Sequence, residues 1–224
     1  VFKHMNGGYQ LVRSITNEYG ISPSEILRVK DKGLVYGCRT FHAVGGCWSP
    51  ERSLSSDISI WYVKVRETSK EFVNGQEALL SITEFDYQNP AHKNPTLVKK
   101  KNSKGEWEYL QTRYLSDFAN GDLDPLSAEM LNQAHMPGLP VQTIESLSKA
   151  GIENVTNSNI VRYKKVNGQY YVIDEAYKFL QDKPVVKSSL QDFPEYKPLV
   201  GIPSGKYLQM SKYEYDGLSN VVWQ

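Results

Sequence analysis

Apolar residues recur every four positions near the start of the chain, and this spacing predicts a pair of short helices. Leu11, Ile15 and Tyr19 share one face of a helix, and Gly20 follows where a helix most easily ends. The next residues, SPSE (22–25), form a capping box with proline at the first helical position. The pattern therefore predicts a helix, a glycine turn and a second helix.

The middle of the chain has a different pattern, typical of β-strands. Its apolar positions tend to alternate with polar ones, and aromatic residues are frequent. Lys104-Gly105 predicts a hairpin turn between the last two strands. Together these stretches predict a four-stranded antiparallel meander over residues 57–65, 76–88, 96–102 and 106–115.

A second helical entry is predicted at residues 138–152, GLPVQTIESLSKAGI, where Ile144 and Leu147 would face inward. Two alternating runs then flank Asn167-Gly168, a strong hairpin signal because both residues tolerate positive φ. Residues 174–180 are predicted to form a helix that buries Ala176 and the Phe179-Leu180 pair.

The fold class predicted from these elements is α+β, an antiparallel β meander flanked by helix-turn-helix-like hairpins at both ends. The Asn-, Asp- and Pro-containing stretch at 119–129 is the predicted boundary. Residues 1–120 would hold the helical hairpin and the sheet. Residues 121–224 would hold a helix, a β-hairpin, a second helix and a C-terminal extension. A single domain is the alternative.

Net charge limits the function classes. The 224 residues carry a formal charge of only +1, whereas nucleic-acid-binding proteins are often strongly basic. Any DNA contact must therefore rest on a local group of basic residues. No long apolar run predicts a membrane span. Cys38 and Cys47 are expected to be free thiols or a single pair, since two cysteines make no disulfide framework.

The stretch YGISPSEILRVKDKGLV resembles the start of MerR and excisionase winged helices. The matching residues are Gly20, Ser22-Pro23 and Lys32-Gly33-Leu34. Residues 138–180 are also similar to excisionase-type modules, with a helix of the form Glu-Ala-x-x-Phe-Leu. The resemblance implies duplex DNA binding by a reading helix at residues 22–33. The predicted DNA-contacting residues are Arg13, Ser24, Arg28, Lys32, Arg39, Lys164 and Lys165.

The same N-terminal letters resemble a second family, the LysM glycan-binding modules, over residues 1–41. Tyr19-Gly20-Ile21-Ser22 and Ile26-Leu27 are similar to its helices, and residues 1–5 would form its first strand. A third interpretation is a structural or assembly component, for example of a phage or virus particle, whose partners are other protein subunits. Fifteen Tyr and four Trp favour such contacts, because Tyr offers large contact area at low entropic cost.

Three catalytic or metal sites are weaker alternatives. Cys47 with His42 or His135 would make a Cys-dependent hydrolase, but Pro50 leaves little room for the helix that activates such a thiol. The second is an ADP-ribosyltransferase-like toxin with Glu106, Glu108 and Arg39. The third is a zinc site from Cys38, His42 and Cys47, with irregular spacing.

The preferred prediction is a non-enzymatic DNA-binding protein with no metal and no cofactor. It is expected in the cytoplasm, or in a virion if the assembly interpretation holds.

Overall fold

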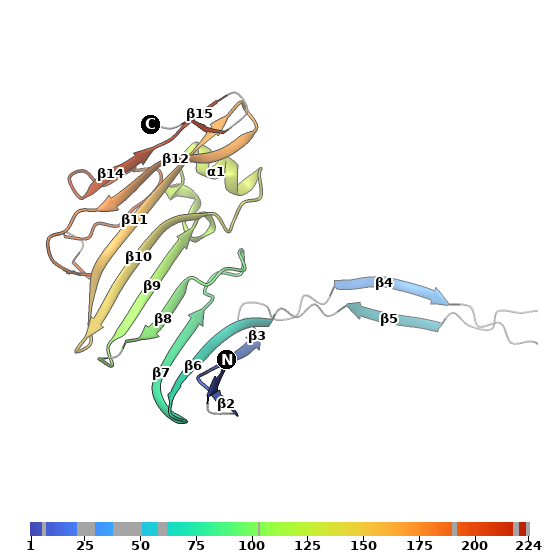
Figure 1. Cartoon of the computed structure of the whole chain (residues 1–224). Helices are drawn as coiled ribbons and strands as arrows, with labels where there is room; N and C mark the ends of the chain where they lie inside the picture. Colours follow the sequence, from blue (N-terminus) through green and yellow to red (C-terminus); the bar gives the residue numbers. More distant parts are fainter. Residues whose placement is uncertain are drawn as a thin grey trace, which may run out of the picture. The chain divides into compact units, whose positions relative to one another are not determined.

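The computed structural model describes residues 1–5, 8–21, 30–37, 51–57, 62–102, 104–189, 192–216 and 220–222 (Figure 1). The chain forms two compact units. The smaller is Gly20–Val63, and the larger combines Val1–Tyr19 with Lys64–Gln224. Across the described residues, regular structure is almost entirely antiparallel β, with one α-helix. The predicted α+β class is therefore wrong.

One large sheet makes up the larger unit. Its strand order is β14-β12-β11-β10-β9-β8-β7-β6-β3, with β13 paired to β11 off this path. Two small antiparallel pairs, β1 with β2 and β15 with β16, accompany it. The strands are β1 (Phe2–Met5), β2 (Gly8–Leu11), β3 (Arg13–Ile21), β6 (Tyr62–Val73), β7 (Gln76–Asp86), β8 (Leu97–Lys101), β9 (Trp107–Tyr114), β10 (Pro140–Lys149), β11 (Ile152–Val166), β12 (Tyr170–Phe179), β13 (Val185–Val186), β14 (Tyr207–Lys212), β15 (Glu214–Tyr215) and β16 (Val221–Val222).

The predicted four-stranded meander is confirmed, because β6, β7, β8 and β9 are consecutive neighbours in the sheet. Its first strand was predicted at 57–65, whereas β6 spans Tyr62–Val73. The last turn of the meander contains Gly105, at a φ of 80° that suits glycine. The predicted Asn-Gly hairpin is confirmed as well. Asn167 and Gly168 join β11 to β12 with φ values of 52° and 68°.

The helix predicted at residues 11–19 is wrong, since this stretch lies in β2 and β3. A spacing of four residues is close to one helical turn, but it is also a multiple of the two-residue repeat of a β-strand. Ile15 and Tyr19 therefore share a face of a strand just as they would share a face of a helix. Gly20 lies inside β3 and ends no helix.

The helices predicted at 138–152 and 174–180 are wrong too. The first is β10, paired with β9 on one side and with β11 on the other, and the second is the end of β12. Ile144 is buried, as predicted, while Leu147 is three residues further along and lies on the opposite face. Phe179 is buried and Leu180 is exposed. Hydrogen bonding to a strand on each side outweighs the local preference of these segments for a helix.

The predicted reading helix falls in the smaller unit. Its last residues belong to β4 (Lys30–Gly37), which pairs with β5 (Glu51–Asp57). Residues 22–29 lie outside the described part of the chain. With β-structure at 11–21, 30–37 and 138–180, the helix-turn-helix and winged-helix architecture is wrong.

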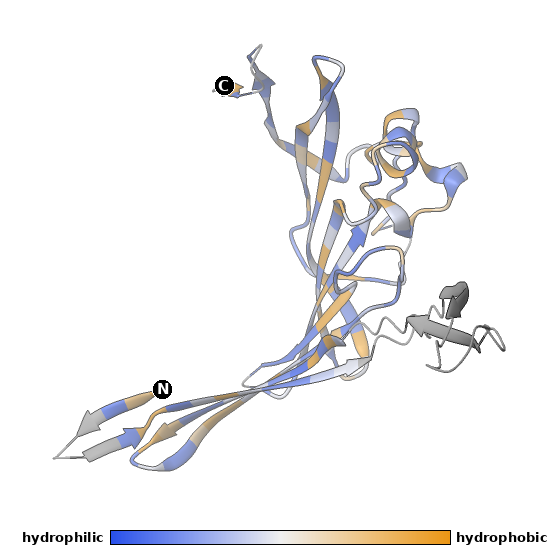
Figure 2. Ribbon diagram, turned by 90° about the vertical axis from the view of Figure 1, so that its right-hand side faces the viewer, coloured by the Kyte–Doolittle hydropathy of each residue, from blue (hydrophilic) through white to orange (hydrophobic). Residues whose placement is uncertain are grey.

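The core of the larger unit lies against β9–β14. Leu115, Met130, Val155 and Ile160 are almost fully inaccessible to solvent. α1 (Pro125–Asn132) packs there, after two 3-10 turns, η1 (Leu115–Asp117) and η2 (Asn120–Asp122). Figure 2 shows these helical segments beside one part of the sheet, with strands alone at the end that holds the N-terminus. No helix in the described ranges is both long and apolar enough to cross a membrane.

The other half of the sheet is a single layer. No described side chain at positions 10–20, 64–86 or 97–102 is buried. Leu79 and Leu80 are adjacent in β7 and point to opposite faces, yet each is nearly half exposed. Val63 of β6 is buried, but it belongs to the smaller unit. We call β3, β7, β8 and the part of β6 from Lys64 onward the single-layer half.

Candidate interaction surface

A buried His–Asp pair is the arrangement closest to a catalytic one. His92 Nδ1 accepts a hydrogen bond from the Asn94 N–H at 3.3 Å, so the ring proton lies on Nε2, which is 3.2 Å from Asp117 Oδ1. Asp117 also accepts bonds from the Asn89 side chain and the Tyr114 N–H. The ring packs on Tyr114 with centroids 4.2 Å apart.

The bonds of this pair identify it as structural. Both ring nitrogens are used within the cluster, and Asp117 holds the turn that begins at Tyr114. The nearby hydroxyl, Ser116 Oγ, donates to the Pro137 carbonyl. Nucleophilic catalysis needs a nucleophile bonded to the base, and within the described part of the chain the hydrogen bonds of His92 involve no hydroxyl or thiol. The cluster anchors the loop at 87–96 to the end of β9.

Most residues of the weaker catalytic and metal interpretations lie outside the part of the chain that the structure describes. Cys38, Arg39, His42 and Cys47 lie outside the described residues. His135 is exposed, directly after α1. Within the described ranges, no group of three or more His, Cys, Asp or Glu side chains could hold a metal ion. Glu106 accepts a bond from the Asn102 side chain in the β8–β9 turn, and Glu108 lies on β9.

The residues predicted to bind DNA are not brought together. Lys164 is 2.9 Å from Asp174 Oδ1, and Lys165 is 2.5 Å from Glu129 Oε1. As neighbours in β11, the two lysines point to opposite faces of the sheet. The Glu129 carboxylate raises the pKa of Lys165, and the lysine in turn lowers the pKa of Glu129.

The remaining predicted DNA-contacting residues are also scattered. Arg13 lies on β3, where its Nε donates to Ser69 Oγ at 3.3 Å. Lys32 lies on β4 in the smaller unit and pairs in register with Ser55. Ser24, Arg28 and Arg39 are outside the described residues.

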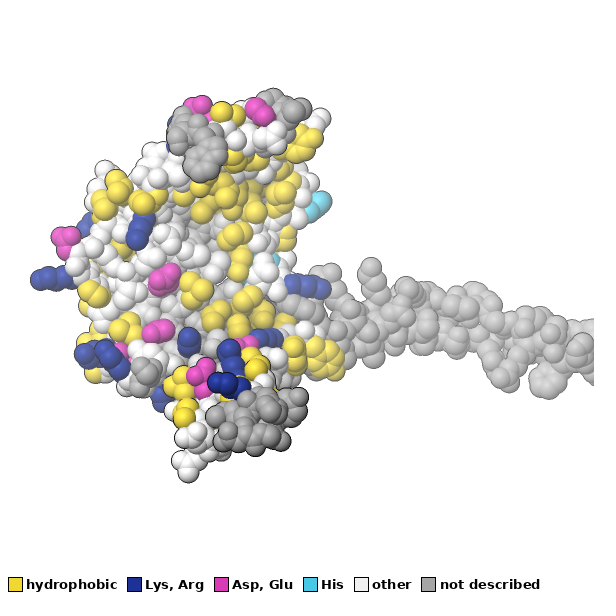
Figure 3. Space-filling model, viewed as in Figure 1, with side chains coloured by type: hydrophobic (Ala, Val, Ile, Leu, Met, Phe, Trp, Pro, Cys, Tyr) yellow, Lys and Arg dark blue, Asp and Glu magenta, His cyan; other side chains and the backbone are white. Residues whose placement is uncertain are grey.

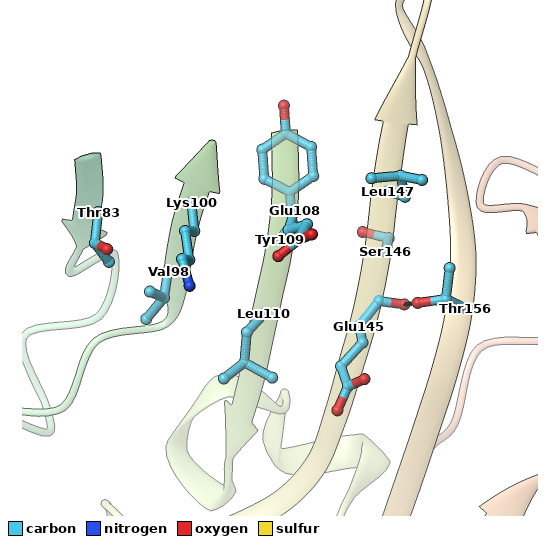
Figure 4. A pocket seen from close by; sticks show the side chains of 10 residues that line it. All are labelled: Thr83, Val98, Lys100, Glu108, Tyr109, Leu110, Glu145, Ser146, Leu147 and Thr156. Carbon is cyan, nitrogen blue, oxygen red and sulfur yellow. Dashed lines mark hydrogen bonds between the residues drawn. The ribbon is translucent and has the colours of Figure 1, made fainter. Parts of the chain in front are cut away.

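Sequence reasoning missed a hollow on one face of the sheet, across β7 to β11 (Figure 4). Two rows of cross-strand neighbours build it. One row runs from Thr83 through Lys100 and Glu108 to Leu147. The other row is more apolar and runs through Val98, Leu110 and Glu145. The hollow has a volume of about 430 Å³.

A second hollow of about 390 Å³ continues the first toward β3. The two share Thr83, Lys100 and Glu108, so they form one trough across the sheet. Together we call them the trough. The second hollow adds Arg13, Glu67, Ser69, Glu71, Leu79, Leu80, Ser81, Lys101 and Asn102.

Charges of both signs line the trough. Glu67, Glu71, Glu108 and Glu145 supply four carboxylates, against three cations, Arg13, Lys100 and Lys101. Figure 3 shows one face of the molecule, on which apolar patches lie beside Lys, Arg, Asp and Glu side chains. A surface that binds the phosphate backbone would be predominantly positive.

The trough could have been anticipated in part from the sequence. Within the predicted meander, alternation places Val98 and Lys100 on one face and Leu97 and Lys99 on the other. The pairing of β9 with β10 could not be anticipated, because β10 was predicted to be a helix.

No protein-family model, curated protein or solved structure matches this chain.

Proposed function

We propose that the chain is a non-enzymatic structural subunit that assembles with further copies of itself through the single-layer half of its sheet. One observation carries the proposal. The described side chains of β3, β7 and β8, and of β6 from Lys64 onward, include none that is buried, although both faces carry large apolar side chains. A sheet normally buries at least one face against another layer.

The exposed fractions of its apolar side chains show how much apolar surface the single-layer half leaves uncovered. Ile15 is 49% exposed, Tyr19 63% and Val73 61%, all on strands that have no second layer. Complete burial of a large apolar side chain contributes about 1.5–3 kcal/mol. Covering these residues with another protein surface would therefore favour association substantially.

The mixed charges of the trough support protein as the partner. Carboxylates and cations alternate along it, as Lys100 and Glu108 do in neighbouring strands. Such a surface offers complementary pairs to a copy of itself and repels neither sign strongly. Duplex DNA would meet four carboxylates there.

Light scattering coupled to size-exclusion chromatography tests the proposal over a wide range of protein concentration. We expect the wild-type mass to exceed that of one chain and to rise with concentration. Association through apolar surface should survive added salt, whereas DNA binding weakens steeply with salt. A mass of one chain at every concentration and salt would refute the proposal. In that case, salt-dependent anisotropy of a labelled duplex would favour DNA recognition instead.

A matched pair of variants locates the contact. Leu79→Lys removes apolar surface but places a cation opposite Glu71, its cross-strand neighbour, so the strand pair should be retained. Val200→Lys makes the same kind of change at an 81% exposed position outside the sheet. We expect only Leu79→Lys to lower the mass. Equal effects of the two variants would contradict assembly through the single-layer half.

A further inference from the structure

β3 is the edge strand of the large sheet, and most of its outer side has no neighbour among the described strands. The N-terminal hairpin covers only its beginning. The Arg13 carbonyl accepts a bond from the Val1 amino group at 2.6 Å, and the Arg13 N–H donates to the Val1 carbonyl at 3.2 Å. Residues 14–19 follow that contact. No described strand pairs with the outer backbone groups of residues 14–19, which we call the open edge.

Two contacts indicate the register of β3 against β6. The Val12 carbonyl accepts a bond from the Phe72 N–H at 3.0 Å, and Glu18 pairs with Arg66 at 3.7 Å. Both contacts fit a single antiparallel register, because Glu18 is six residues after Val12 and Arg66 is six residues before Phe72.

In an antiparallel ladder, alternate residues direct both backbone groups to the same neighbour. Arg13 directs both its N–H and its C=O to Val1, away from β6, so the even-numbered residues of β3 face β6. Ile15, Asn17 and Tyr19 direct their N–H and C=O groups outward, as Arg13 does toward Val1.

The side chains of these three residues lie on the same face as Arg13 and the trough. That face of the edge carries no charge from Ile15 to Tyr19, and both of these side chains are exposed. Natural edge strands are usually protected by charges, prolines or bulges. The opposite edge, β14, has such a bulge at Met210.

We propose that a second copy of the chain pairs with this edge, antiparallel, about a two-fold axis at Asn17. The inference rests on the proposed function and specifies its contact. Asn17 would oppose Asn17 of the second copy, and Ile15 would oppose Tyr19 of the second copy, twice by symmetry. On the other face, Thr16 would oppose Glu18 of the second copy, so no like charges meet.

This register uses every outward backbone group from Ile15 to Tyr19. Three outward residues in each copy would form about six backbone hydrogen bonds by the alternation of antiparallel pairs. Moving the axis to Thr16 would pair Tyr19 with Arg13, whose backbone groups are already bonded to Val1. The axis at Asn17 also buries both exposed apolar side chains against each other. Strand addition of this kind is a common mode of recognition.

Single-cysteine crosslinking tests the register. In a parent chain with Cys38 and Cys47 changed to Ser, Asn17→Cys places two thiols at the axis. Hydrogen-bonded pairs have Cα atoms about 5.5 Å apart, inside the range that a disulfide spans. Mild oxidation should convert most of this variant to a covalent dimer that dithiothreitol releases.

Ile15→Cys is the matched control, on the same face of the same strand. Its two copies would be about 13 Å apart along the paired strands and should give at least tenfold less dimer. Mixing Ile15→Cys with Tyr19→Cys should restore a crosslink between the two variants. Circular dichroism of each variant against the unmodified chain verifies folding.

The outcomes separate the two proposals. If the wild type associates but Asn17→Cys does not crosslink, or crosslinks no better than Ile15→Cys, the edge contact is wrong and assembly uses another surface. If the wild type is a single chain at every concentration, the proposed function fails as well.

Discussion

The free energy of unfolding should be far more sensitive to truncation at Met130 than at Leu79, because only one half of the sheet has a core. Met130 is fully inaccessible to solvent and belongs to the core cluster on α1. Met130→Ala removes three heavy atoms from this close-packed site. Truncations of this type cost about 2–5 kcal/mol, the larger values where the cavity cannot collapse.

Leu79 provides the contrast, since it is 46% exposed. Complete burial of a leucine side chain contributes about 1.5–3 kcal/mol, so roughly half of that is at stake. The surface around Leu79 is open to water, and its truncation leaves no enclosed cavity. Leu79→Ala should therefore cost at most about 0.8–1.5 kcal/mol.

Urea denaturation followed by circular dichroism measures both values. The protein should be dilute enough for light scattering to report a single chain, because assembly would add the free energy of association to both. A Met130→Ala effect below about 1 kcal/mol would show that the core near α1 is not closely packed. Equal effects at the two positions would show that the single-layer half is already covered within one chain.

Three further predictions concern single positions. Asp124 caps α1 by accepting bonds from the Leu126 and Ser127 N–H groups, so Asp124→Ala should lower the free energy of unfolding by about 1 kcal/mol in the same urea assay. Gly138→Ala would place a Cβ 2.8 Å from the Asn94 side chain, so its melting temperature should fall measurably, and an unchanged temperature would mean that Asn94 moves aside freely. Burial raises the pKa values of Tyr196 and Tyr163 to about 12, so the stability that each contributes is complete below pH 10 and disappears as pH rises through 12; ultraviolet absorbance should show late-titrating tyrosines, one fewer in Tyr196→Phe.

Local sequence patterns were enough to predict much of the β structure. The meander from β6 to β9 could be predicted because its strands are sequential, and the β6–β7 and β8–β9 pairs are joined by short turns. The Asn167-Gly168 hairpin could be predicted because few residues other than Asn and Gly adopt positive φ readily. In both places the local signal and the long-range pairing favour the same structure.

The tertiary structure decided the rest, wherever one local pattern fits two elements. Ile15 and Tyr19, four residues apart, share a face in a strand or a helix, and pairing of β3 with β6 selects the strand. β10 is likewise a strand because β9 and β11 lie on either side of it. The trough is made by residues far apart in the sequence, and the edge at residues 14–19 depends on which strand pairs with β3, so neither exists until these strands are placed. A chain's local preferences are worth tenths of a kcal/mol per residue, and a pair of neighbouring ladders outweighs them.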